Sequence, residues 1–258
     1  MFELRIALTP AAINLMKADL AKTLASVKSS HRIEAVARGL GFGTNAAMRA
    51  AVKANLPLRA EVRWHPFASY LAEKGFAPEI APFFHCCARV AMNAVMRAHP
   101  RLTLWGIETG ERERLPGGAR ETLEQYRARI AATRAELLER DSIEQFLLSL
   151  ALLAEVKATK TISDSSSYWV KHIAENFPCT YPHGAKLGPA YVANGAVIAA
   201  AAHAGFIVRE YPGSPNTCFN MSRRSLIDLD CRVRPNGPYA GVRRWKESMR
   251  RGRPARAA

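Results

Sequence analysis

Hydrophobic positions recur at intervals of three and four residues through most of the chain, the spacing that marks one face of an amphipathic helix. Proline, glycine and small polar residues interrupt this spacing and separate one helix from the next. The pattern predicts helices over residues 10–29, 31–39, 44–54, 66–74, 82–98, 119–140 and 193–204, one that begins at Ser142, and one that begins near Asp164 and ends at Phe177.

Alternation of apolar and polar residues, the pattern of a half-buried strand, is confined to short segments. Residues 2–8 and residues 101–107 each predict one strand. Phe206–Tyr211 and Asn216–Met221 flank a Pro-Gly-Ser-Pro turn and predict a hairpin. We therefore expect a mainly α protein with a small β component, an α+β fold.

Residues at the helix ends add detail to this prediction. Ser142 and Gln145 match a capping box, and Asp164 or one of the three serines after it can cap the helix that follows. Gly205 suits the left-handed residue that ends the Ala-rich helix 193–204. Because that helix is apolar nearly all round, we expect it to be buried.

Changes in composition divide the chain into four parts. We predict a helical region over 1–115, a helical hairpin over 116–158, an α+β module over 159–236 and a disordered basic tail over 237–258. The helical hairpin carries an apolar line at Leu123, Tyr126, Ile130 and Leu137. Such a line predicts either packing within the protomer or a homodimer interface.

Residues Ile33–Val52 resemble a helix-turn-helix unit. The apolar, small, turn and inward positions of that motif are matched by Val36, Ala37, Leu40, Gly41, Phe42, Ala47 and Ala50. The small residue and the glycine are needed because the two helices cross closely. The resemblance implies that Asn45, Arg49 and Lys53 face outward, where they can reach base edges or phosphates. A plain helical packing unit is the alternative.

The segment Thr159–Asn220 runs helix, helix, hairpin, an order that resembles winged-helix DNA binders. A helix that reads base edges presents polar side chains to the groove, whereas the helix before this hairpin carries little beyond Asn194 and His203. We therefore expect that helix to be scaffold. The segment also resembles uncharacterised proteins carried by bacterial plasmids and phages, a resemblance that implies no activity.

Charge favours a polyanionic partner, because 37 Lys and Arg stand against 22 Asp and Glu, a formal net charge of +15. The tail contains Arg251-Gly252-Arg253-Pro254, which resembles the core of an AT-hook, in which Arg-Gly-Arg lies in the minor groove of AT-rich DNA. The tail residues expected to bind nucleic acid are Arg243, Arg244, Lys246, Arg250, Arg251 and Arg253. A solvated tail that binds any nucleic acid through counterion release is the alternative.

Five cysteines at unpatterned spacing favour a reducing compartment over a disulfide framework. Early charges interrupt any secretory signal, and the apolar stretches 146–156 and 191–208 are too short or too broken to span a membrane. We expect a cytoplasmic protein with no membrane partner. Adjacent Cys86 and Cys87 lack a second pair, and no phosphate-binding loop is found, so neither a metal nor a cofactor is expected.

One group of residues could carry chemistry. Lys171 and His172 are the catalytic candidates, with Ser167 beside them in sequence and Asn194, Asn216 and Asn220 near them in the expected module. A general base of this kind would fit a nuclease. Alternatively, these residues cap helices and hold the turn of the predicted hairpin.

Together these patterns predict a nucleic-acid-binding protein, most specifically a DNA-binding regulatory or architectural protein of a bacterium or a mobile element. An RNA-binding protein or ribonucleoprotein subunit would use the same charge. A protein-interaction or inhibitor module would instead use the apolar segment Thr159–Asn220. A nuclease that depends on His172 is the remaining alternative.

Overall fold

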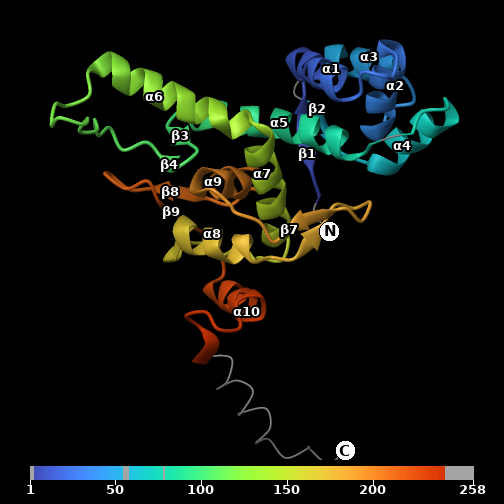
Figure 1. Ribbon diagram of the computed structural model, residues 1–258. Helices are drawn as coiled ribbons and strands as arrows, with labels where there is room; N and C mark the ends of the chain where they lie inside the picture. The colour runs from blue at the N-terminus through green and yellow to red at the C-terminus, as the bar shows by residue number, and fades with distance from the viewer. Residues whose placement is uncertain (1–2, 55–57, 78, 242–258) are drawn as a thin grey trace, which may run out of the picture.

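The computed structural model describes residues 3–54, 58–77 and 79–241. Helices dominate these residues and the strands form small antiparallel sheets, so the predicted α+β class is confirmed (Figure 1). The helices are α1 (Pro10–Thr23), α2 (Ser29–Gly39), α3 (Asn45–Ala54), α4 (Trp64–Glu73), α5 (Ala81–Ala98), α6 (Leu123–Ala135), α7 (Arg140–Leu153), α8 (Ser167–Glu175), α9 (Asn194–His203) and α10 (Arg223–Val233). The strands are β1 (Arg5–Leu8), β2 (Leu58–Glu61), β3 (Leu102–Thr103), β4 (Gly106–Ile107), β5 (Ser165–Ser166), β6 (Cys179–Thr180), β7 (Lys186–Gly188), β8 (Val208–Glu210) and β9 (Thr217–Phe219).

In the N-terminal part of the sequence, the paired strands β1 and β2 are separated by the three helices α1, α2 and α3. β1 pairs antiparallel with β2, and Arg5 lies opposite Glu61. The alternation that predicts a strand over residues 2–8 is borne out, because Leu4, Ile6 and Leu8 are buried. Sequence patterns do not predict β2, because its four residues become a strand only by pairing with β1.

Helix α5 joins the two halves of the molecule and coincides with the predicted helix 82–98. It contacts α1 and β1 from the N-terminal half and α7 and α9 from the C-terminal half. Cys86 and Cys87 are buried in it, and burial raises the pKa of the Cys87 thiol. The hydrophobic core is therefore continuous from the N-terminal helices to α9.

In the C-terminal half, α7, α8 and a three-stranded sheet of order β5-β9-β8 surround α9. The predicted hairpin is present as β8 and β9, with Val208 opposite Phe219. Helix α9 is buried along most of its length, as its apolar sequence predicts. Gly205, at φ +86°, follows its C-terminal end. α10, which sequence patterns do not predict, begins after the capping side chain of Ser222.

The prediction of a single strand over residues 101–107 is wrong, because this segment folds back as the hairpin β3–β4. Thr103 lies opposite Gly106, which adopts φ +123°. A residue other than glycine rarely takes this conformation. The turn therefore depends on the one residue that interrupts an otherwise strand-like sequence.

The capping box predicted at Ser142 is also wrong, because α7 begins two residues earlier at Arg140. Ser142 is buried in the first turn, and Gln145 accepts a hydrogen bond from the amide of Ala193 (2.8 Å). That bond ties α7 to the start of α9. A reciprocal capping box occurs one helix earlier, at the start of α6.

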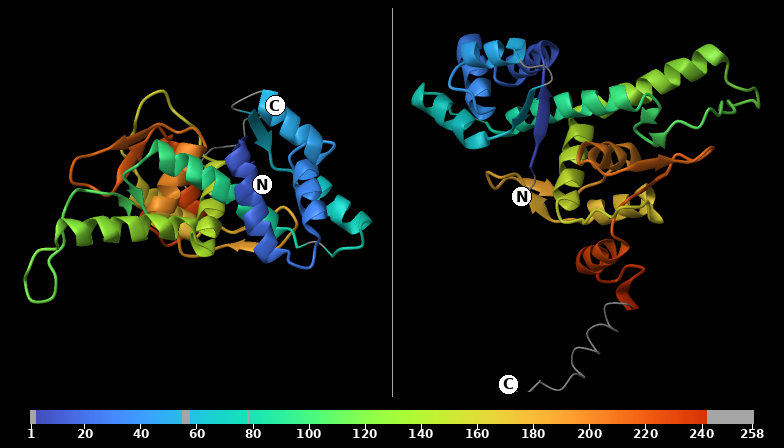
Figure 2. Two further views of the ribbon diagram at one scale, coloured as in Figure 1. Left: turned by 90° about the horizontal axis from the view of Figure 1, so that it is seen from above. Right: turned by 180° about the vertical axis from the view of Figure 1, so that it is seen from behind.

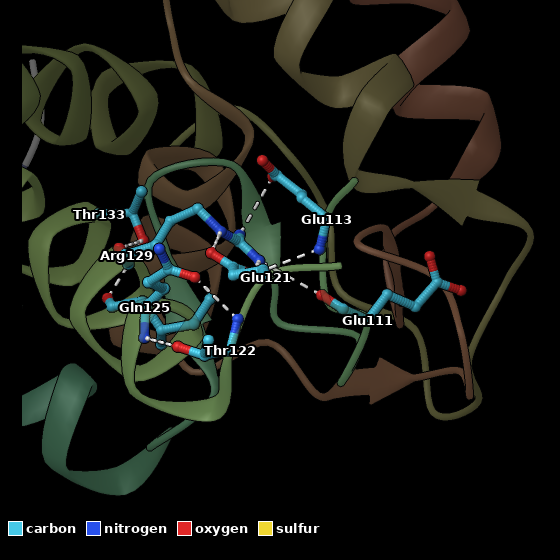
Figure 3. A network of polar contacts seen from close by, with 8 residues as sticks. Glu111, Glu113, Glu121, Thr122, Gln125, Arg129 and Thr133 are labelled. Atoms are coloured by element: carbon cyan, nitrogen blue, oxygen red, sulfur yellow. Dashed lines mark hydrogen bonds and ion pairs between the residues drawn. The ribbon is translucent and has the colours of Figure 1, made fainter. Parts of the chain in front are cut away.

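Helix α6 and the loop before it, residues 111–135, form an arm that projects away from α1–α4 (Figures 1 and 2). Arg129 fixes the loop, because its Nε and Nη2 each donate to the Glu121 carboxylate at 2.9 Å, and the same carboxylate accepts from the Glu113 amide at 3.2 Å (Figure 3). These hydrogen bonds from Arg129 lower the pKa of Glu121. The buried Glu121 carboxylate therefore ties the loop at Glu113 to Arg129 of α6.

The turn between β8 and β9, residues 211–216, which we call the wing turn, projects to the same side as the arm (Figures 1 and 2). The β3–β4 hairpin lies between them and is bonded to both. The amide of Leu104 donates to the carbonyl of Thr133 in α6 (3.1 Å), and the amide of Ile107 donates to the carbonyl of Pro215 (2.9 Å). Arm, hairpin and wing turn therefore occupy one side of the molecule.

Candidate nucleic-acid interface

The helix-turn-helix candidate consists of α2, a tight turn at Gly41 and α3. Gly41 adopts φ +86°, its amide donates to the carbonyl of Arg38 (3.0 Å), and the amide of Phe42 donates to the carbonyl of Ala37 (2.8 Å). This pair of bonds is the Schellman arrangement that ends a helix at glycine. The Thr44 side chain then accepts from the amide of Ala47 (3.0 Å) and starts α3. The turn thus has the geometry that its sequence predicts.

The inward face of α3 differs from the predicted one. Ala47 and Ala50 are exposed, whereas Met48 and Val52 are buried. The larger side chains remove more apolar area from water, so they take the positions against α2. The prediction of Ala47 and Ala50 as inward residues is therefore wrong, and the two alanines lie on the open side of the helix.

Arg49 and Lys53 lie on the exposed surface of α3, as the resemblance implies, and Asn45 is half-buried at its start. The backbone amide of Asn45 donates to the Glu34 carboxylate (2.9 Å), and the side-chain oxygen of Asn45 accepts from Arg49 Nε (3.3 Å). Among the described residues neither Arg49 nor Lys53 has a carboxylate partner. Two cations are thus presented on one helix without internal neutralisation.

The surrounding helices add positive charge. Residues 10–54 contain seven Lys and Arg and two acidic residues, Asp19 and Glu34. Asp19 pairs with Arg89 of α5 at 2.7 Å and is largely buried, and Glu34 accepts from the start of α3. Because both carboxylates are engaged internally, the surface of α1–α3 is basic.

Helix α9, the helix that precedes the β8–β9 hairpin, is largely buried. The Asn194 side chain donates to the carbonyl of Trp105 (3.3 Å) and of Pro215 (3.1 Å) and to the side chain of Asn216 (3.1 Å). His203 is partly buried with its ring edge-on to Phe146. The two polar residues of this helix therefore serve contacts inside the protein.

Lys171 and His172 come together on one carboxylate. Lys171 Nζ lies 2.5 Å from one oxygen of Glu175, and His172 Nδ1 lies 2.7 Å from the other. Burial raises the pKa of Glu175, but the hydrogen bonds from Lys171 and His172 outweigh it, so that the pKa of Glu175 is lowered. Ser167 is buried and bonded to the amide of Thr217 (3.1 Å), away from this group. Glu175 therefore holds His172 through Nδ1, and Lys171 shares the same carboxylate.

Two tyrosines border this group. The Lys171 ammonium lies 5.8 Å from the ring centroid of Tyr168 and 4.9 Å from that of Tyr191, and Tyr168 is edge-on to His172 at 4.5 Å. Helical spacing predicts Tyr168 on the same side of the helix as His172, but it gives Tyr191 no role. An aromatic residue shortly after a proline in a predicted loop is the signal that could have identified it.

A cavity of about 1000 Å³ lies between β1, α5, α7 and α9. Alanines and other apolar residues are the most numerous in its lining, and Glu3, Arg5, Arg59, His99 and His203 add polar groups. None of the described residues predicted to bind nucleic acid or to catalyse a reaction lines this cavity. The helix-turn-helix candidate and the Lys171–Glu175 group are therefore surface features independent of it.

The tail residues Arg243, Arg244, Lys246, Arg250, Arg251 and Arg253 lie outside the described residues. No protein-family model, curated protein or solved structure matches the chain. Within residues 3–54, 58–77 and 79–241, no helix is long and apolar enough to cross a bilayer, and no three His, Cys, Asp or Glu side chains gather in a way that could hold a metal ion. None of the five cysteines is joined to another.

Proposed function

We propose that this protein binds duplex DNA through α3, which enters the major groove with Arg49 and Lys53 toward phosphates and base edges. The observation that carries the proposal is the division of α3 into a buried side, Met48 and Val52, and an open side with two cations that have no carboxylate partner among the described residues. Within the described part of the chain, the main packing partner of α3 is α2. A peripheral helix of this kind is free to approach a polyanion.

The dimensions and side chains of α3 suit a groove. Its ten residues span about 15 Å at 1.5 Å per residue, and the major groove of B-DNA, about 12 Å wide, admits an α-helix. Ala47 and Ala50 on the open side have short side chains, so the part of the helix between the cations can approach DNA closely. Arginine can bond to guanine edges or to phosphates, whereas lysine acts chiefly as a point charge.

The test is a binding assay on Arg49→Ala, Lys53→Ala and the double variant, with a DNA duplex and an RNA duplex of the same sequence. We expect Arg49→Ala to weaken DNA binding by roughly 5- to 150-fold if it contacts a base, and Lys53→Ala to lower the salt slope by about 1. The RNA duplex should bind less well, because its deep, narrow major groove excludes a helix.

Lys186→Ala is the matched control, because Lys186 is an exposed lysine in β7, far along the chain from α3. It removes the same charge without touching the proposed interface. A double variant that binds the DNA duplex as tightly as the unmodified protein, or a loss of equal size in the Lys186 control, would overturn the proposal.

A further inference from the structure

Three aromatic side chains stand exposed around the N-terminal end of α9. Trp105 is 60% exposed, Tyr191 57% and Tyr168 54%. They come from three separate segments: the β3–β4 turn, the loop before α9 and the first turn of α8. Large aromatic side chains are usually mostly buried in a folded domain. Three exposed rings on segments that meet near the start of α9 therefore call for an explanation beyond folding.

A hydrogen bond holds the Trp105 backbone at the start of α9, and cation–π contacts hold the two tyrosine rings around Lys171. The carbonyl of Trp105 accepts from the Asn194 side chain (3.3 Å), three residues after Tyr191. The Lys171 ammonium lies between the other two rings, 4.9 Å from the centroid of Tyr191 and 5.8 Å from that of Tyr168. Backbone hydrogen bonds hold the β3–β4 turn against α9, so the backbone of Trp105 is fixed in position.

Lys171 orders this group rather than serving as a free cation. It is 9% exposed and lies 2.5 Å from a Glu175 oxygen. A neutralised, buried ammonium between two tyrosine rings fixes them through cation–π attraction. The faces that remain open are therefore aromatic and uncharged, as surfaces for base stacking are.

The arm, which is bonded to the β3–β4 hairpin that carries Trp105, contains six Arg and four Glu residues and is therefore net positive. The arm carries the exposed residues Arg112, Arg114, Arg120 and Arg127. Two of its carboxylates, Glu113 and Glu121, are occupied by Arg129 (Figure 3). Across the β3–β4 hairpin from the arm, β8 and the wing turn add exposed Arg209 and the half-exposed Tyr211 (Figures 1 and 2).

We propose that the surface formed by Trp105, Tyr168 and Tyr191, together with the arginines of the arm, binds single-stranded DNA. Unpaired bases stack on the three rings, and phosphates bind the guanidinium groups of the arm. Protein-binding surfaces are depleted of charge at their centre and joined by apolar contact, whereas this surface combines separate rings with the arginines of the arm. The choice of DNA rests on the proposed function of α3; the stacking surface does not, because it shares no residue with α3.

The experiment measures binding of a fluorescently labelled oligo-dT strand to the full chain by anisotropy, at about 0.3 M salt so that non-specific charge attraction is reduced. We expect Trp105→Ala and Tyr191→Ala each to weaken binding roughly 5- to 150-fold, the range that corresponds to the loss of one base-stacking contact. Trp105→Phe should retain most of the affinity, because it keeps an aromatic face.

Ile207→Ala is the matched control. Ile207 is 52% exposed and lies at the end of the β8–β9 hairpin remote from the wing turn, so its loss removes exposed apolar surface outside the proposed face. A second readout is tryptophan fluorescence: oligo-dT should quench the unmodified protein more than Trp105→Phe. This difference reports contact at Trp105 even where an alanine variant folds poorly.

Single-strand affinity that is unchanged in both alanine variants, together with equal quenching in Trp105→Phe, would overturn the proposal. Tighter binding of oligo-U than of oligo-dT would overturn the assignment to DNA. The outcome is separable from that of the proposed function: Arg49→Ala and Lys53→Ala should leave single-strand binding intact, and Trp105→Ala should leave duplex binding intact.

Discussion

Gly195, in the first turn of α9, lies so close to Thr103 that a Cβ atom at position 195 would stand 1.9 Å from the Thr103 carbonyl oxygen. The amide of Gly195 also donates to the carbonyl of Leu104 (2.9 Å). The β3–β4 hairpin is therefore seated directly on the backbone of α9, and only glycine permits this approach.

Gly195→Ala should destabilise the protein, because neither backbone can move without breaking the bond between them. We expect a loss of about 1–3 kcal/mol in the free energy of unfolding, the usual size for overpacking. Urea unfolding followed by circular dichroism measures it. Gly43→Ala is the control, since no atom lies within 4 Å of a Cβ there; a stability of Gly195→Ala equal to that of the control would contradict the packing argument.

The arm should open when its buried carboxylate is neutralised. In Glu121→Gln the bidentate ion pair with Arg129 is lost, which weakens the attachment of the loop at residues 111–120 to α6. We expect trypsin to cleave after Arg112, Arg114 or Arg120 several times faster, with little change in melting temperature, because the opening is local.

Glu124→Gln provides the matched comparison for the arm. Glu124 is exposed in the first turn of α6, so its neutralisation removes the same charge without disturbing the loop. Equal cleavage rates in the two variants, measured by mass spectrometry of the fragments, would show that the Glu121–Arg129 pair does not hold the arm.

Stability should fall as the pH drops below about 6.5. Burial lowers the pKa of His203, helped by Arg59, and burial lowers the pKa of His85 against the opposite effect of Glu144. The unfolded chain therefore takes up protons at a pH where the folded protein keeps both rings neutral, and the slope is at most about 1.4 kcal/mol per pH unit for each histidine.

Thermal unfolding between pH 7.5 and 5 tests this dependence. The melting temperature should be nearly constant above about pH 6.5 as far as these two groups contribute, and should decline below it. His203→Gln should flatten part of the decline, because the variant has one fewer group to protonate. A decline as steep in the variant as in the unmodified protein would exclude His203 as a cause.

Removal of residues 242–258 should weaken DNA binding and its salt dependence together. The segment carries seven Lys and Arg and one acidic residue, and each phosphate that is no longer neutralised lowers the slope of log affinity against log salt by about 0.9. If Arg251-Gly252-Arg253 acts as an AT-hook, the truncation should also abolish preference for AT-rich duplex. Binding that is unchanged at every salt concentration would remove the tail from the proposed interface.

Local patterns in the sequence determined most of the helices and their ends. Helical periodicity identified α1, α5 and α8, Gly41 marked the turn before α3, and the Ala-rich composition of α9 indicated its burial. Such features depend on neighbours within one or two turns, because side-chain period and backbone capping are local properties. The exposure of Arg49 and Lys53 could be predicted from the sequence for the same reason.

Only the tertiary structure decided which distant residues meet. β2 exists because β1 pairs with it. The β3–β4 hairpin packs against α9 because Gly195 admits the Thr103 carbonyl, and Tyr191 comes from another segment to lie beside Lys171. Nor did spacing show that Met48 and Val52, rather than the alanines, would face α2. Register and side-chain contact between separate segments depend on the shape and volume of both partners, and no single stretch of sequence contains both.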